Sequence, residues 1–161
     1  IKISKLMSVH VINQIIKKEW TDYNNHLNMT YYVLIFEKAL EVLLDKFMMG
    51  SHSAKTTKMS TMMVETLTTY NNEVKEGDEV EVVLTFFDHD KKRLYLKLEM
   101  IEKVSKKLSS TIEMLSLYID LNKRKVTEFE NEKVKIMDEF INTNKSKFVN
   151  NDLSILGKLK K

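Results

Sequence analysis

The fold of this chain is decided by the stretch Trp20-Thr21-Asp22-Tyr23-Asn24-Asn25-His26-Leu27-Asn28 and the apolar run that follows it, residues 29–49. The stretch is polar and rich in asparagine, which tolerates positive φ and favours turns. A polar loop directly before a long helix is well placed to present a reactive group. Asp22 is the first candidate, although a carboxylate here also serves as an N-terminal cap or dipole partner.

The composition of the 161-residue chain is that of one globular domain, since 43% of its residues are hydrophobic and 30% are charged. The net charge of +3 gathers near the C-terminus, not in a stripe interleaved with aromatic residues. We therefore expect no nucleic-acid partner. The chain has no cysteine, which excludes disulfides, thiolate metal sites and a cysteine nucleophile.

The apolar run is too short and too often interrupted by charges to cross a bilayer, so we expect no stable membrane insertion. The sequence shows no secretory signal and is interpreted as cytoplasmic. It begins at Ile1 and not at Met, which leaves open whether residues precede it.

Residues 30–49 are predicted to form a long helix. Its other faces are apolar too, so the helix should be surrounded by the rest of the chain. Asn28 is the expected N-cap, and Gly50 is placed for a left-handed C-terminal cap. The helical spacing is carried by Tyr32, Phe36, Leu40, Leu43 and Phe47.

Extended segments flank this helix. One precedes it, over residues 7–16, and an antiparallel meander follows a polar link at residues 51–58. A second amphipathic helix is predicted at residues 130–141. We expect a single domain over residues 1–141 and a polar, basic tail over residues 142–161. The inward face of the meander is predicted to carry Val80, Val82, Leu84, Phe86, Leu94, Leu96, Leu98 and Met100.

No metal or other cofactor is expected. Glu37 and Glu41 lie one helical turn apart, but no histidine joins them at ligand spacing. The run Asp88-His89-Asp90 coincides with a hairpin tip, where aspartate is favoured by turn geometry alone.

The loop Asp22-Tyr23-Asn24-Asn25-His26-Leu27-Asn28 resembles the Asp-x-x-Gly-His-x-Asn signature of hotdog acyl-CoA thioesterases of the 4-hydroxybenzoyl-CoA thioesterase type. Further matches at Tyr31-Tyr32, Val64-Glu65-Thr66 and residues 73–78 are similar to the betainyl-CoA thioesterases. The resemblance implies an α+β hotdog fold. In that fold a five-stranded antiparallel sheet wraps around a long central helix, here with an added C-terminal helix.

The resemblance also implies that Asp22 is the catalytic carboxylate, acting as general base or nucleophile on a thioester. Backbone amides around Asn25, His26 and the helix start would then stabilise the oxyanion, and Asn28 would hold the loop. Asn25 stands where the family has glycine. It can adopt the left-handed conformation, but its side chain narrows the site.

Substrate contacts are expected on the same grounds. A quaternary ammonium such as that of betainyl-CoA would need an aromatic, partly anionic cage, although each aromatic candidate is equally explained by core packing. The cage candidates are Trp20, Tyr23, Tyr31, Tyr32 and Glu65. The candidate partners of the CoA phosphates are Lys91, Lys92 and Arg93, for which a solvated hairpin tip is the alternative.

The expected function is hydrolysis of a small acyl-CoA by a homodimer or tetramer. The alternative is a hotdog module that binds acyl-CoA, or dimerises, without turnover. An enoyl-CoA hydratase is disfavoured because its Asp-x-Asn-Pro-x-His motif lacks the proline here and His26 falls one residue early. The basic tail leaves open an association with anionic membranes.

Overall fold

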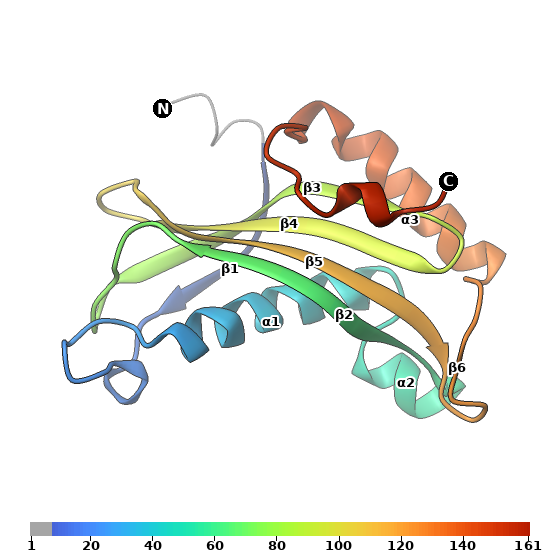
Figure 1. The fold of residues 1–161 in the computed structure, drawn as a ribbon, viewed down its shortest axis with the longest axis horizontal. Coiled ribbons are helices and arrows are strands. Elements are labelled where there is room, and N and C mark those ends of the chain that lie inside the picture. The colour runs from blue at the N-terminus through green and yellow to red at the C-terminus, as the bar shows by residue number, and fades with distance from the viewer. Residues whose placement is uncertain (1–7) are drawn as a thin grey trace.

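In the computed structural model, which describes residues 8–161, one antiparallel sheet curls around a long helix (Figure 1). Part of the first predicted strand, residue 7, lies outside the described residues. The strands are β1 (Val9–Ile15), β2 (Met59–Tyr70), β3 (Glu79–His89), β4 (Arg93–Glu102), β5 (Leu108–Asp120) and β6 (Lys125–Val126). The helices are α1 (Met29–Lys46), α2 (Ser51–Thr57) and α3 (Asn131–Asn144). Short 3-10 turns lie at Lys18–Trp20, Lys145–Lys147 and Leu156–Lys158.

The strand order is β1-β3-β4-β5-β2, with the two-residue β6 paired to the end of β5. Every pairing is antiparallel. The predicted sheet around a helix is therefore confirmed, with β1 and β2 as its edge strands. One prediction is wrong: residues 51–58 are not a plain polar link, because most of them form α2, which packs beside β2.

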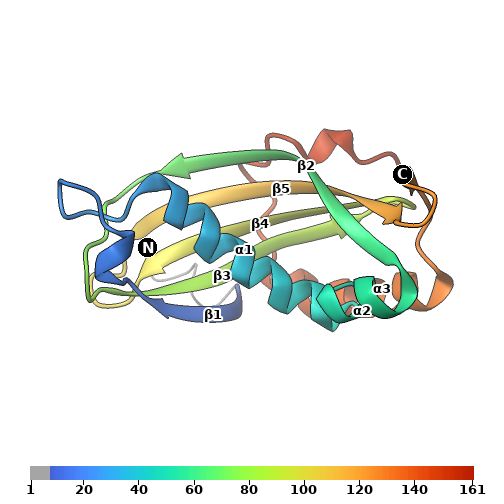
Figure 2. The ribbon, with the colours of Figure 1, turned by 90° about the horizontal axis from the view of Figure 1, so that it is seen from below.

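Helix α1 supplies the centre of the core. Ile35, Phe36 and Ala39 are fully buried against the concave face of the sheet, below which α1 runs in Figure 1 and in front of which it lies in Figure 2. Helix α3 closes one end of this core, where Phe140 packs edge-on against Phe47 and Phe87. Within the described residues no helix is long and apolar enough to cross a membrane.

The prediction that Phe86 faces inward on β3 is wrong, because β3 contains a β-bulge. The register between β3 and β4 shifts between Leu84 and Phe86, so the alternation of side chains slips by one residue. Phe87, and not Phe86, is buried in the core beside α1. Phe86 lies on the outer face, where it contacts Tyr95 at a ring-centroid distance of 5.8 Å.

The predicted left-handed cap at Gly50 is also wrong. Met48 takes the left-handed conformation, with φ of 60°. Gly50 has φ of −75° and instead precedes the first residue of α2. Glycine suits this position because a Cβ would overlap the Asp45 carboxylate unless that side chain moved.

The C-terminal segment, defined here as residues 148–161, lies across the outer face of the sheet, opposite α1 (Figure 1). Ile155 is buried against Tyr95 and Leu115. The amide of Ile155 donates to Oε1 of the buried Glu113 at 3.1 Å, and Tyr95 donates its hydroxyl proton to the same oxygen at 2.6 Å. Burial, followed by the hydrogen bond and charge of Glu113, raises the pKa of Tyr95.

Asp90 ties this segment to the β3–β4 turn. Its carboxylate accepts from the amides of Lys92, Arg93 and Lys160, each at 2.8 Å, and from Nη1 of Arg93 at 2.9 Å. Burial acts to raise the pKa of Asp90, but these hydrogen bonds outweigh it and hold the pKa below its usual value.

We predict that Asp90→Ala lowers the free energy of unfolding by about 2–3 kcal/mol, because it leaves several donors unpaired. A depressed carboxylate pKa stabilises the fold above the unfolded-state pKa, about 3.9, and this contribution is lost as the pH falls through the folded-state pKa. Urea unfolding at pH 7 and at pH 3 should therefore show a smaller difference between variant and parent at pH 3. An equal difference at both pH values would contradict the assignment.

Candidate active site

The loop from Trp20 to Asn28 emerges at the end of the sheet where α1 begins. Asn28 is the N-cap of α1, as predicted: its side chain accepts from the amide of Thr30 at 3.0 Å. Its own amide donates to the carbonyl of Trp20 at 2.9 Å, which closes the loop at its base. Asn25 has φ of 61°, so the left-handed conformation expected at the position of the family's glycine is confirmed.

Asp22 is held by the loop that it belongs to. Its Oδ1 accepts from the amide of Asn24 at 2.8 Å and from that of His26 at 3.4 Å. Its backbone carbonyl accepts from the amide of Asn25, and its amide donates to the carbonyl of His26 at 2.9 Å. Among the described residues none contacts Oδ2, so one carboxylate oxygen is left for another molecule.

A second segment supports this loop from the side. The amide of Leu27 donates to the carbonyl of Val74 at 2.9 Å, and His26 forms an isolated antiparallel bridge with Lys75. Nε2 of His26 lies 2.8 Å from Oε2 of Glu73. The contact could not be predicted from local sequence, because residues 26 and 73 are brought together only by the sheet.

Asp22 and His26 line a pocket of about 310 Å³. Tyr32 and Tyr70 meet edge-to-face at 5.3 Å on its wall. Burial, chiefly, raises the pKa of Tyr32, so its hydroxyl stays protonated at neutral pH. The complete lining is Asp22, His26, Leu27, Met29, Tyr32, Tyr70, Asn71, Asn72 and Glu73.

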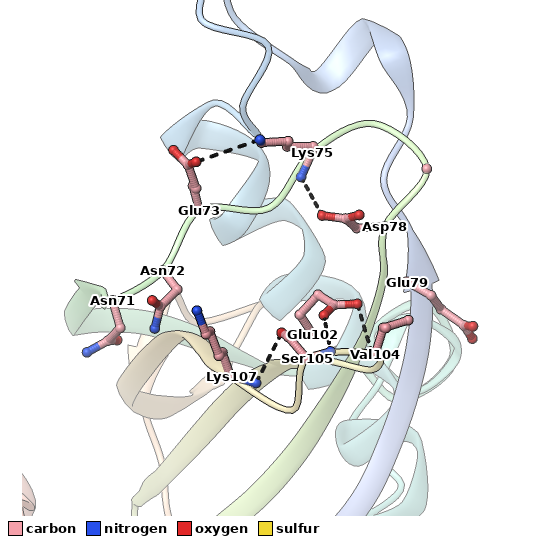
Figure 3. A pocket seen from close by; sticks show the side chains of 11 residues that line it. Asn71, Asn72, Glu73, Lys75, Asp78, Glu79, Glu102, Val104, Ser105 and Lys107 are labelled. Atoms are coloured by element: carbon pink, nitrogen blue, oxygen red, sulfur yellow. Dashed lines mark hydrogen bonds and ion pairs between the residues drawn. The ribbon is translucent and has the colours of Figure 1, made fainter.

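A larger, open hollow of about 960 Å³ adjoins this pocket at the same end of the sheet (Figure 3). The two share Asn71, Asn72 and Glu73, which therefore form the boundary between them. Acidic side chains outnumber lysines in the hollow. The charged residues that line it are Glu73, Lys75, Asp78, Glu79, Glu102 and Lys107.

Three of the predicted cage residues lie outside the pocket. Trp20 is buried and stacks on Tyr31, with ring centroids 5.6 Å apart. The ammonium groups of Lys17 and Lys38 lie 5.0 and 4.9 Å from the Trp20 ring centroid, so this ring already contacts two cations. Tyr23 is 95% exposed on the loop.

The remaining predicted residues lie further away. Glu65, on β2, pairs with Lys158 of the C-terminal segment. The turn that holds Lys91, Lys92 and Arg93 lies at the opposite end of the sheet from the Asp22 loop in Figures 1 and 2, and Arg93 is paired with Asp90. Within one copy of the chain the structure therefore does not bring these four side chains to the pocket.

Residues that sequence reasoning missed are Tyr70, Asn71, Asn72 and Glu73. They occupy the end of β2 and the connection to β3. Glu73 begins the stretch 73–78 that resembles the betainyl-CoA thioesterases, which could have drawn attention to it, whereas no motif marks the other three. In the part of the chain that the structure describes, no group of three or more His, Cys, Asp or Glu side chains is arranged to hold a metal ion.

The family model of the thioesterase-like superfamily matches residues 16–140. The chain belongs to this superfamily. It is 31% identical over 114 residues to the betainyl-CoA thioesterase of Pseudomonas aeruginosa, an alignment that covers 71% of this chain and 72% of that protein. Family membership makes the chain a thioester hydrolase.

Solved structures agree on the fold. A Staphylococcus aureus protein determined in complex with CoA superimposes with a TM-score of 0.78 at 22% identity, over 96% of both chains. A 1,4-dihydroxy-2-naphthoyl-CoA thioesterase from Synechocystis superimposes with a TM-score of 0.72 at 14% identity, over 82% of this chain and 96% of that one. The chain thus has the hotdog fold of these thioesterases.

We predict that Asn25→Gly preserves stability, because glycine adopts positive φ without strain, whereas Asn25→Ala costs about 1–2 kcal/mol. Thermal unfolding of the two variants beside the parent measures this difference. If alanine were tolerated as well as glycine, the left-handed turn would not constrain the loop.

Proposed function

We propose that the chain hydrolyses a small acyl-CoA to the free acid and CoA, with Asp22 as the catalytic carboxylate. The observation that carries the proposal is that Asp22 lines the pocket with Oδ1 held by two loop amides and Oδ2 free of contacts with described residues. A carboxylate in this state either takes a proton from water or attacks the thioester carbonyl itself. In the first case the activated water adds to the carbonyl carbon, and in the second a mixed anhydride forms with Asp22 and is then hydrolysed by water. In both cases the C–S bond breaks, CoA leaves as the thiolate, and the proton taken from water is available to protonate it.

The oxyanion needs a hydrogen-bond donor at the helix start. The amides of Asn25 and His26 already donate to Asp22. The amide of Met29 donates to no residue that the structure describes, and Met29 lines the pocket at the N-terminus of α1. The positive end of the helix dipole would add to that donor, so we assign the oxyanion contact to Met29 N.

A cationic acyl group such as betainyl suits the pocket. Tyr32 and Tyr70 offer aromatic surfaces, and Asp22 and Glu73 place two carboxylates on the same lining. A quaternary ammonium is attracted by both kinds of group. The 31% sequence identity to the betainyl-CoA thioesterase of Pseudomonas aeruginosa supports the same choice of substrate.

We predict that betainyl-CoA is hydrolysed with a kcat/KM about tenfold or more above that of 3,3-dimethylbutyryl-CoA. The two acyl groups have the same shape and differ by the charge, so the ratio measures the cation contacts, for which about 1.4 kcal/mol gives a factor of ten. Release of free thiol from each acyl-CoA is the measurement. Equal kcat/KM values for the two substrates would contradict the proposal of a cationic acyl group, while the proposal of acyl-CoA hydrolysis would still stand.

We predict that Asp22→Asn lowers kcat/KM about 10²- to 10⁴-fold on the best substrate of a panel that also holds short straight-chain and aromatic acyl-CoAs. Asparagine keeps an acceptor for the two loop amides, so the fold should persist. If the parent binds acyl-CoA but releases no thiol from any substrate, the chain is a binding module and Asp22 is structural.

A homodimer through β2 would complete the site. One edge of β2 pairs with β5, and the other edge has no neighbouring strand among the described residues. A 12-residue unpaired edge is an open template for pairing with a second copy. The pocket opens beside this edge, at Tyr70 and Met29, so a partner would cover it. The exposed large apolar side chains of β2 are Met62, Met63, Val64, Leu67 and Tyr70.

We predict that Val64→Lys produces monomers and lowers activity, because the partner's contact with the pocket is lost. Ile15→Lys, the same change at an exposed position on the opposite edge strand β1, should leave the oligomeric state unchanged. Sedimentation velocity and thiol release on both variants measure this. Monomers produced only by Ile15→Lys would place the interface on β1.

A further inference from the structure

The contact between His26 and Glu73 has a consequence for Asp22 beyond the proposed hydrolysis. His26 touches Asp22 through its backbone twice: its carbonyl accepts from the Asp22 amide at 2.9 Å, and its amide approaches Oδ1 at 3.4 Å. The second of these is long for a hydrogen bond. A small displacement of His26 would therefore break it and leave the Asp22 carboxylate held by the amide of Asn24.

Residues 73–75 hold His26 in place with three different kinds of contact. The backbone of Lys75 forms the bridge with His26, the carbonyl of Val74 accepts from Leu27, and the carboxylate of Glu73 lies 2.8 Å from Nε2 of His26. The two backbone contacts fix the path of the chain. Only the Glu73 contact fixes the imidazole ring.

Residues 71–73 are themselves anchored to the sheet. The amides of Asn71 and Asn72 both donate to the carbonyl of Ser109, and Nδ2 of Asn72 donates to the carbonyl of Leu108 at 2.7 Å. Glu73 follows directly, so its carboxylate is presented to the loop from the start of β5. Lys75 Nζ lies at 4.0 Å on the other carboxylate oxygen.

The contact between His26 and Glu73 also bears on the charge of the pocket. Asp22 and Glu73 line the same pocket, and two carboxylates on one lining repel each other. Nε2 of His26 lies 2.8 Å from Oε2 of Glu73, so this carboxylate oxygen has a close partner in the Asp22 loop.

We propose that Glu73 is a positioning residue that acts on Asp22 through His26, an inference that rests on the proposed catalytic role of Asp22. The pair is partly exposed, with 34% of the His26 side chain and 55% of the Glu73 side chain accessible. Exposed pairs of this kind contribute little to the free energy of unfolding. The contact should therefore matter far more for turnover than for stability.

The test combines single and double variants. On neutral 3,3-dimethylbutyryl-CoA, where the attraction between Glu73 and a cationic acyl group is absent, Glu73→Ala and His26→Ala should each lower kcat about ten- to a hundredfold with little change in KM, because a misplaced group costs rate rather than binding. If both act through one contact, the double variant should lose no more than either single variant. Glu73→Gln retains an acceptor for the His26 ring and should recover most of the rate.

Glu76→Ala is the matched control, since Glu76 is an exposed acid on the same connection and does not line the pocket. It should keep the parental kcat. Tm should fall by no more than about 3 °C in each single variant. Multiplicative losses in the double variant, or a change confined to KM, would overturn the proposal and make Glu73 a substrate contact.

Hydrogen exchange of the loop separates this proposal from the proposed function. Amides in peptides covering residues 21–28 should exchange faster in Glu73→Ala than in the parent or in Glu76→Ala. This readout needs no turnover. If the parent proves inactive on every acyl-CoA, faster exchange in Glu73→Ala still establishes that Glu73 holds the loop. Unchanged exchange in Glu73→Ala overturns the positioning role of Glu73.

Discussion

The burial of α1 is the constraint from which the rest of the structure follows. This helix buries one broad face, and each large side chain on that face is worth about 1.5–3 kcal/mol. Val33, Glu37 and Val42 stay exposed on the other face, although the sequence predicts a helix surrounded on all sides. The strands curl around the buried face (Figure 2). The N-terminus of α1 must then emerge at an end of the sheet, where its unpaired amides and positive dipole end face a pocket.

Curvature of the sheet also explains the outer face. The bulge in β3 directs Phe87 toward α1 and turns Phe86 outward, beside Tyr95. An apolar patch of this kind needs a cover. The C-terminal segment provides it, and the amide of Val149 donates to the carbonyl of Thr85, the residue at which the register shifts. One irregularity thus shapes the core and anchors the tail.

The sequence predicts those features that depend on local periodicity or on turn chemistry. The spacing of apolar residues in α1, the alternation of Leu94, Leu96 and Leu98, and the left-handed Asn25 are of this kind. The bulge in β3 could not be predicted, because register is a property of two strands together. The left-handed cap predicted at Gly50 is wrong because glycine is favoured there by the close approach of the Asp45 side chain, and not by a positive φ.

The same distinction applies to the candidate site. Asp22, His26 and Asn28 lie within one loop motif, so sequence reasoning could find them. Tyr70 and Glu73 are more than 40 residues away and reach the loop only through the sheet; the resemblance at residues 73–78 includes Glu73 but does not say that it faces the loop. Trp20 and Tyr31 were proposed as cage residues for their aromatic character, yet they stack on each other outside the pocket.

The charges around the pocket constrain how a CoA thioester can approach it. Asp22 and Glu73 line the pocket itself, and acids outnumber lysines in the adjoining hollow. The phosphates of CoA are anionic and would be repelled from both. Under the proposed function the acyl end would therefore enter first, with the thioester carbonyl at the start of α1. The same acids that disfavour the phosphates would attract a cationic acyl group, so the proposed orientation and the proposed class of substrate follow from one charge distribution.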